Sequence, residues 1–254
     1  MTPELMQNRY CIDVRTMTEA ISIDTNKKTV TLRTADRTYE ESYDRLVLAT
    51  GARPFRPPVD GIDSPRIHTL WSVPDAVRLR EMAENADHVA VIGGGFVGLE
   101  TAENLVQAHK KVTLIEAADQ VMAPLDIEMA TLIHNHLREK GVSLVLSDGV
   151  KSFADDADGL TIALNSGNII KVQQALLAIG TRPNTEIARE AGISCDRRGF
   201  VLVDKNMKTS ADDVYAAGDI AVTQDIIFDE PANVPLAGPA AKQGRAIAGI
   251  IGLR

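Results

Sequence analysis

The sequence predicts an α/β fold that combines a parallel sheet with antiparallel β-meanders. An apolar strand at 88–92 leads into a glycine-rich turn and a helix, and a second apolar strand at 111–115 ends in an acid. Two other stretches, 12–38 and 150–172, alternate apolar and polar residues between turn residues. A strand-helix-strand unit belongs in a parallel sheet, whereas short alternating stretches favour antiparallel hairpins.

The elements follow in order along the chain. The first meander is expected to place strands in "CIDVRT", "AISID" and "KTVTLRT". An apolar strand at 46–49 then runs into Thr-Gly and a proline-rich exit, which ends the first segment. "VPDAVRLREMAEN" predicts a helix entered through Pro-Asp, and 126–141 predicts another, capped by Asp126 and closed by Gly141, with a strand in "VSLVLS" after it.

An internal duplication is also visible. "RLVLATGARP" at 45–54 and "QALLAIGTRPN" at 174–184 share an apolar strand, a glycine and an Arg-Pro pair. Each follows a meander, so the 88 residues up to the first strand of the glycine unit resemble the second part of a similar domain.

Composition excludes several classes of protein. With 254 residues, 44% of them hydrophobic, the chain can bury one large or two moderate cores. The net charge is −8 and no run of Lys or Arg exceeds two, so neither nucleic acid nor an anionic membrane is expected as partner. No apolar run approaches the ~20 residues that cross a bilayer, and the N-terminus lacks a signal-peptide core, which predicts a cytoplasmic protein with small-molecule ligands.

Gly93, Gly95 and Gly98 occupy the positions of a G-x-G-x-x-G turn between the first apolar strand and its helix. The first glycine permits the tight turn, the second lets the backbone approach a pyrophosphate, and the third lets helix and strand pack closely. The helix N-terminus then faces the negative charge. These features predict a Rossmann-like dinucleotide-binding domain.

Glu116 lies 23 residues after Gly93, at the end of the second apolar strand. An acid at this place accepts hydrogen bonds from a ribose 2′-hydroxyl and repels a 2′-phosphate, so NAD is expected rather than NADP. Lys110 and Lys111 leave open how strict that preference is.

Three other groups of residues are not expected to form a disulfide framework or a metal site. Cys11 and Cys195 stand far apart and outside any C-x-x-C arrangement, so we expect neither a disulfide framework nor a zinc site. His134 and His136 stand two apart on a helix and point to different faces, unlike a metal-binding pair. The acidic stretch "ADDADG" lacks the terminal acids of a calcium loop and is expected to be a turn.

Two C-terminal stretches, "TSADDVYAAGDIA" and "VPLAGPAAKQGRAIAGII", together with "ATGARP", resemble the pyridine nucleotide-disulfide oxidoreductases. The resemblance spans nearly the whole chain and is to the single-cysteine branch, which contains coenzyme A disulfide reductases, NADH oxidases and peroxidases. In that family an NAD domain is inserted in a split FAD domain. The resemblance therefore implies FAD-domain segments at 1–74 and 206–254 and an NAD(H)-binding domain at 75–205.

The resemblance also implies site residues. Phe96 would cover the flavin until nicotinamide displaces it, and Glu100 would lie near the carboxamide. The implied NAD-binding residues are Gly93, Gly94, Gly95, Phe96, Val97, Gly98, Glu100, Glu116 and Gly180.

For the flavin, the resemblance implies that Thr50 and Gly51 lie along the dinucleotide and that Asp219 bonds the ribityl or pyrophosphate region. "PLAG" at 235–238 would begin a helix whose N-terminal amides face the pyrimidine edge of the ring, where reduced flavin carries negative charge. The implied FAD-binding residues are Thr50, Gly51, Arg53, Gly218, Asp219, Leu236 and Ala237.

Parts of the family pattern are absent from this sequence. It lacks the N-terminal glycine motif for FAD, the helix with the redox cysteine, and the C-terminal dimerisation domain, so we expect a chain truncated at both ends. Neither Cys11 nor Cys195 matches the nucleophile, so no catalytic or metal-binding residue is assigned, and Ala241 stands where an amide is expected. The strands left without neighbours need cover from a homodimer partner, a rearranged remnant or a complementing chain.

The implied activity is FAD-dependent transfer of hydride from NADH to flavin, and then of electrons to a disulfide, peroxide or oxygen acceptor. Because the redox cysteine and part of the FAD site are absent, FAD retention and turnover by this chain stay open. The alternatives are an NAD-binding module without redox activity and one half of a split enzyme.

Overall fold

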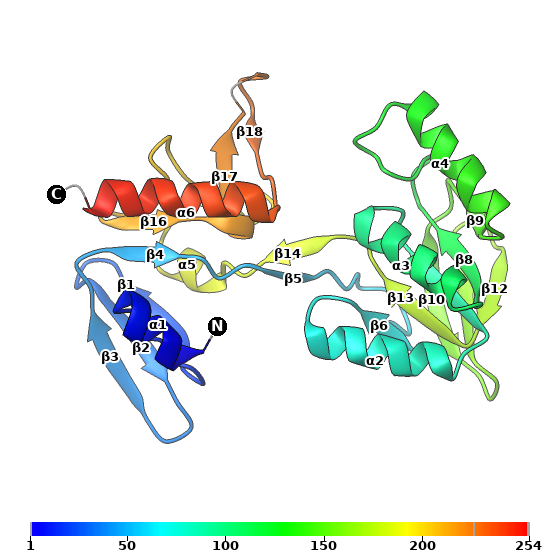
Figure 1. Cartoon of the computed structure of the whole chain (residues 1–254), viewed down its shortest axis with the longest axis horizontal. Coiled ribbons are helices and arrows are strands. Elements are labelled where there is room, and N and C mark those ends of the chain that lie inside the picture. Colours follow the sequence, from blue (N-terminus) through cyan, green and yellow to red (C-terminus); the bar gives the residue numbers. More distant parts are fainter. Residues whose placement is uncertain (1, 226, 253–254) are drawn as a thin grey trace. The chain divides into compact units, whose positions relative to one another are not determined.

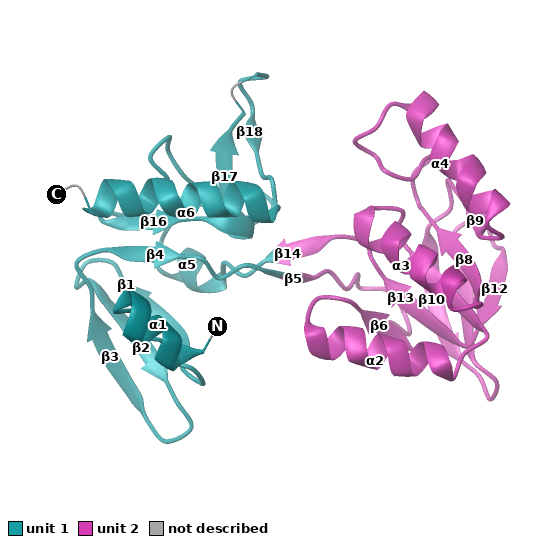
Figure 2. Ribbon diagram, viewed as in Figure 1, with its two compact units in different colours: residues 1–52, 183–254 teal, residues 53–182 magenta. Residues whose placement is uncertain are grey.

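The computed structural model describes residues 2–225 and 227–252. Met1, Leu253 and Arg254, at the outer ends of the two expected FAD-domain segments, lie outside the described part, as does Ile226. The chain divides into two compact units, residues 53–182 and residues 1–52 with 183–254 (Figure 2). None of the described helices is both long and apolar enough to span a membrane.

The 53–182 unit is built on a five-stranded parallel sheet (Figure 1). The strand order is β6-β13-β7-β8-β9, and each neighbouring pair is parallel. The predicted parallel sheet is confirmed. Its strands are β6 (Ile67–Thr69), β7 (His88–Ile92), β8 (Lys111–Ile115), β9 (Ser143–Val145) and β13 (Gln174–Leu177).

Both faces of this sheet are buried. Val89 and Val91 of β7 pack with helix residues such as Leu105 and Leu137. The alternate residues of the same strand, Ala90 and Ile92, belong to the core that contains the meander. Apolar side chains are therefore needed on both faces, which explains the continuous apolar run in the sequence.

Three helices cover one face: α2 (Val73–Glu84), α3 (Phe96–Gln107) and α4 (Ile127–Glu139). A capping box begins α2, in which Ser72 and Asp75 bond each other's backbone N–H. Asp126 occupies the N-cap of α4 as predicted, but its side chain makes no capping hydrogen bond. Gly141 follows α4 with φ of +82°.

The antiparallel meander of this unit consists of β10 (Val150–Asp155), β11 (Leu160–Leu164) and β12 (Ile169–Val172). The predicted turn after β10 is confirmed, because Asp156 Oδ1 accepts the Asp158 N–H within the link to β11.

The other unit contains the first meander, with one part placed differently from the prediction. Its strands are β1 (Glu19–Asp24), β2 (Thr29–Arg33) and β3 (Thr38–Ser42), paired antiparallel in that order. The prediction of a strand in "CIDVRT" was wrong. A helix, α1 (Pro3–Tyr10), ends there in a left-handed Cys11. Arg15 instead binds Glu41 of β3 through its side chain.

Around this meander lie short strands and two helices. Strand β4 (Leu46–Leu48) pairs in parallel with β16 (Val214–Ala216), and among the described strands it pairs with no other. Ile23, Leu48, Ile220 and Ile247 share the core of the unit. Its other elements are α5 (Glu186–Glu190), β15 (Val201–Leu202), a 3₁₀ turn (Gly218–Ile220), β17 (Ala221–Gln224), β18 (Pro231–Ala232) and α6 (Ala237–Gly252).

The internal duplication is present in the fold. Each meander precedes a parallel strand, a glycine and a short strand: β4, Gly51 and β5 (Ala52–Pro54) in one case, β13, Gly180 and β14 (Thr181–Pro183) in the other. Both glycines have positive φ, +65° and +96°. The two short strands pair with each other. Positive φ at the same place explains the shared glycine.

The borders of the compact units differ from the expected limits at 75 and 205. Because β6 pairs with β13, the segment before α2 joins the parallel sheet, and the unit begins at 53. At the other end Ile193 and Val201 pack in the core of the other unit, so the border falls at 182.

Candidate nucleotide-binding site

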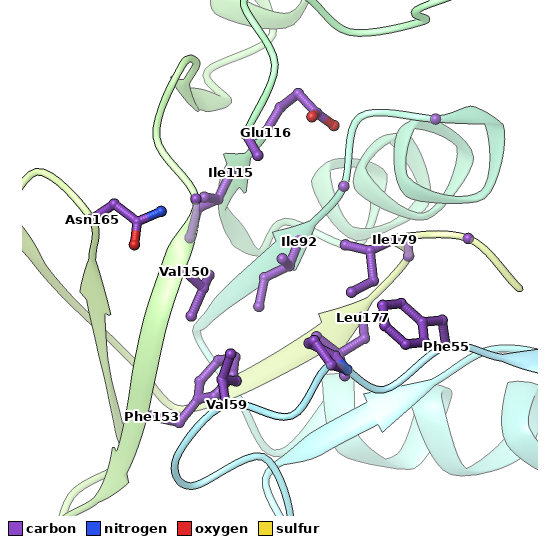
Figure 3. Close-up of a pocket in the computed structure, with 17 residues that line it drawn as sticks. Phe55, Val59, Ile92, Ile115, Glu116, Val150, Phe153, Asn165, Leu177 and Ile179 are labelled. Atoms are coloured by element: carbon purple, nitrogen blue, oxygen red, sulfur yellow. The ribbon is translucent and has the colours of Figure 1, made fainter. Parts of the chain in front are cut away.

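A cavity of about 590 Å³ opens at the carboxyl ends of three neighbouring strands in the 53–182 unit (Figure 3). Ile92, Ile115 and Leu177, the last residues of β7, β8 and β13, line it. The start of the meander and the segment at 55–59 complete its wall. In parallel α/β sheets this is the edge at which ligands bind.

The first glycine of the motif is required by its own backbone. Gly93 has φ of +107°, and a Cβ there would collide with the carbonyl oxygen of Ala178. A Cβ on Gly98 would likewise meet the carbonyl oxygen of Gly93. The turn and the first turn of α3 are therefore packed backbone against backbone, as the motif predicts.

Gly95 has the opposite surroundings. It is the N-cap of α3 and it lines the cavity, and no residue beyond its two chain neighbours has an atom within 4 Å of the position of a Cβ. The first N–H groups of a helix lack intrahelical partners. Together these features leave room for an anionic group to approach the start of α3 without meeting a side chain.

Glu116 is fixed beside this turn. Its Oε2 accepts the Gly94 N–H at 2.7 Å and its Oε1 accepts the Ala118 N–H at 2.8 Å. The residue also lines the cavity. Each carboxylate oxygen has a further lone pair, so the group can still accept bonds from ligand hydroxyls.

The structure gathers only some of the predicted NAD-binding residues. Gly93, Gly95, Glu116 and Gly180 line the cavity, and Gly94 and Gly98 shape the turn beneath it. The other three, Phe96, Val97 and Glu100, lie outside it on α3. The Phe96 side chain is exposed, and the other two line a groove between α2 and α3.

Most of the predicted FAD-binding residues lie next to the ends of strands or at the starts of helices. Thr50 Oγ1 donates to the carbonyl of Asn184, and Gly51 follows at positive φ. Gly218 has φ of +76°, and Asp219 follows it in the 3₁₀ turn. Exposed Leu236 and Ala237 stand at the start of α6, where "PLAG" predicted a helix, and Arg53 lies in β5.

The sequence comparisons identify the family. The profile of the pyridine nucleotide-disulphide oxidoreductases matches residues 4–244. The chain belongs to this family. Its members bind FAD and NAD(P)H.

Three members of this oxidoreductase family illustrate the similarity. A coenzyme A disulfide reductase of Staphylococcus aureus is 32% identical over 97% of this chain and 56% of its own length. The solved NAD-dependent persulfide reductase from A. fulgidus is 39% identical, with a TM-score of 0.93 over 98% of this chain and 46% of that one. A water-forming NADH oxidase from Lactobacillus brevis, bound to NADH, is 35% identical, with a TM-score of 0.86 over 92% and 52%. The chain thus spans about half the length of these oxidoreductases.

One residue of this chain was missed by sequence reasoning. Gln243 of α6 accepts the Gly218 N–H at 2.7 Å and so fixes the glycine that precedes Asp219. An amide was expected at the position of Ala241, and the structure brings an amide to the turn from two residues further along. Half a helical turn separates the two positions, which spacing alone did not resolve.

The two cysteines differ in environment. Cys11 is exposed and Cys195 is partly buried. Burial raises the pKa of the Cys195 thiol, which favours the protonated and less nucleophilic form. Among the residues that the structure describes, no group of three or more His, Cys, Asp or Glu side chains is placed to hold a metal ion.

Proposed function

We propose that this chain is the nucleotide-binding part of a FAD-dependent NADH oxidoreductase, and that NADH binds in the cavity at the ends of β7, β8 and β13. The observation that carries the proposal is the arrangement of three neighbours at that edge. Gly95 is open to the cavity, the α3 N-terminus begins there, and Glu116 is fixed beside it. A pyrophosphate fits beside Gly95 at the N-terminus of α3, and a ribose diol fits beside the Glu116 carboxylate.

The position of charge supports NADH over NADPH. The Glu116 carboxylate would repel a 2′-phosphate, and the six residues after it, "AADQVM", contain no Lys or Arg to neutralise one. Lys111 begins β8 and Lys110 precedes it, so at ~3.3 Å per residue the two lie about 16 and 20 Å along the chain from Glu116. They are too far along the strand to hold that phosphate.

The proposed FAD contacts lie in the other unit, except Arg53, which is the first residue of the 53–182 unit. Gly51 and Gly218 bring the backbone close to the ligand at positive φ, Gln243 fixes the second of these turns, and the N-terminus of α6 supplies partial positive charge for reduced flavin. Bound FAD would supply a hydride acceptor. Phe96 and Glu100, on the first turns of α3, are the proposed nicotinamide contacts.

The domain assignment is proposed from the family resemblance: an NAD(H)-binding segment at 75–205 and FAD segments at 1–74 and 206–254. These limits differ from those of the compact units, 53–182 and 1–52 with 183–254. A homodimer partner or a complementing chain is proposed to pair with β4, whose Val47 side chain is 41% exposed although it lies in an apolar strand. A cytoplasmic location and the choice of disulfide, peroxide or oxygen as acceptor stay predictions.

A second candidate function is NADH binding without redox chemistry. It is favoured by one observation, that every residue lining the cavity belongs to the 53–182 unit. Nucleotide binding in this cavity would then require nothing from residues 1–52 and 183–254.

The test is a visible absorption spectrum of the purified chain before and after anaerobic addition of NADH, together with a binding titration. A flavin band that bleaches supports the oxidoreductase. A colourless protein that binds NADH supports the second candidate. A chain that binds no NADH overturns both.

A further inference from the structure

His134 is a buried histidine in the middle of α4, with 5% of its surface exposed. Its Nε2 accepts the backbone N–H of Val121 at 3.1 Å. A backbone N–H can only donate, so Nε2 is unprotonated and the ring is neutral in this arrangement. The bond joins α4 to the loop between β8 and α4, residues 116–126.

The same loop contacts the glycine turn. Val121 is fully buried, and its side chain occupies the space that a side chain on Gly94 would need. The next residue, Met122, donates its N–H to the Gly94 carbonyl at 2.9 Å. On its other side Gly94 donates to Glu116 at 2.7 Å. The loop therefore holds Gly94 through packing and through both backbone groups.

We propose that His134 is a positioning residue for the dinucleotide. By accepting the Val121 N–H it holds the 116–126 loop in contact with Gly94, and so it fixes the glycine turn relative to Glu116. The proposal rests on the proposed function, since it requires that the nucleotide bind at this turn. His134 touches no part of the cavity, and it acts through Val121.

Protonation removes the acceptor. A charged imidazole has N–H on both nitrogens, so Nε2 would face the Val121 N–H donor to donor. Burial lowers the pKa of His134, Arg138 of the same helix acts in the same direction, and Asp119 of the loop opposes them. The contact is therefore complete above the ordinary histidine pKa of about 6.5, and it is lost only as the pH falls through the lowered pKa of His134 in the folded protein.

The test is the dissociation constant for NADH of the full chain between about pH 5 and 8, measured by NADH fluorescence, for four proteins. The wild type should bind progressively more weakly on the acid side. His134→Gln keeps an acceptor that does not titrate, so its affinity for NADH near pH 7.5 should stay within about threefold of the wild type. The acid limb, meaning the loss of NADH affinity as the pH falls, should be absent from this variant. His134→Leu should bind about tenfold more weakly at pH 7.5. His136→Gln, an exposed histidine on the same helix, is the matched control and should follow the wild type.

A melting curve of each variant at each pH separates positioning from loss of fold. The expected result is that His134→Gln and wild type melt alike at pH 7.5 and that the Val121 amide resonance shifts with the same pH midpoint as the affinity. Retention of the acid limb in His134→Gln would overturn the inference while leaving NADH binding intact. An affinity loss that only follows the folded fraction would also overturn it. No NADH binding by the wild type at any pH would overturn the proposed function, and the inference with it.

Discussion

The backbone N–H of Gly94 donates a hydrogen bond to the Glu116 carboxylate at an N···O distance of 2.7 Å. The glycine turn and the acid at the end of β8 are therefore one connected unit before any ligand arrives. Changes at Glu116 should alter both the contact with ribose and the geometry of the turn.

Glu116→Ala should weaken NADH binding by roughly 10- to 100-fold, because charge-assisted hydrogen bonds contribute about 1.5–3 kcal/mol. It should also reduce the difference in affinity between NADH and NADPH, since the repulsion of a 2′-phosphate is removed. Titrations with both nucleotides measure the two effects, with the exposed Glu128→Gln as control. Unchanged NADH affinity would show that the site has been misplaced.

Gly95→Val should abolish NADH binding and leave the melting temperature within a few degrees of the wild type. Gly95 has an ordinary extended backbone with φ of −80°, and the space around it is open to the cavity. A side chain there fills the room needed by the pyrophosphate. Calorimetric titration and a melting curve check the pair of outcomes, and a Val variant that binds NADH normally contradicts the assignment.

Gly93→Ala should behave differently, because the strain is in the protein itself. The positive φ and the clash with the Ala178 carbonyl predict a loss of about 2 kcal/mol or more in the free energy of unfolding, with weaker NADH binding as a consequence. Urea unfolding measures it. A variant as stable as the wild type would mean that the turn has another conformation.

Cys11→Ser and Cys195→Ser should each leave NADH binding, and any NADH consumption, unchanged. In a thiol-reagent assay Cys11 should react quickly and Cys195 slowly, because Cys11 is exposed and burial raises the pKa of Cys195. A large loss of NADH consumption in either variant would identify a redox thiol where none is assigned.

The pKa of Asp75 leads to a prediction of how the free energy of unfolding changes with pH. Hydrogen bonds from Ser72, first from its side chain and then from its backbone, lower the pKa of Asp75 to about 2. A lowered carboxylate pKa stabilises the fold above the unfolded value of about 3.9, and the stabilisation is lost as the pH falls through about 2. Asp75→Ala should therefore cost about 1 kcal/mol at pH 7 and progressively less in acid, as measured by denaturant unfolding.

The parts of the fold that could be predicted are those whose signal is local. The glycine turn, the two apolar strands and Glu116 lie within 30 residues, and strand burial on both faces of β7 requires the apolar run that reveals it. The turn residues and the acid accordingly meet at one cavity. Phe96, Val97 and Glu100 follow on α3 and lie outside the lining of this cavity, because a helix carries successive residues about 100° around and about 1.5 Å along its axis.

The parts that could not be predicted depend on partners distant in sequence. The strand expected in "CIDVRT" alternates correctly but has no neighbouring strand to pair with, whereas β3, "TYEES", is mostly polar and pairs with β2. The helix α1 buries no residue and so has no apolar stripe. The role of His134 runs through a backbone N–H across a loop, for which the side-chain pattern contains no signal.

Because β5 pairs with β14, the 53–182 unit can be regarded as an insertion that could be removed from the chain as one piece. The chain enters it and leaves it through adjacent strands, and the Phe55 N–H donates to the Gly180 carbonyl at 3.0 Å just inside. Paired strands lie only about 4.8 Å apart, so the points at which the chain enters and leaves the unit are as close together as the two strands of a β-hairpin. Deleting the unit would leave ends at 52 and 183 that a tight turn can join, and the excised unit would have neighbouring termini suited to insertion elsewhere or to circular permutation.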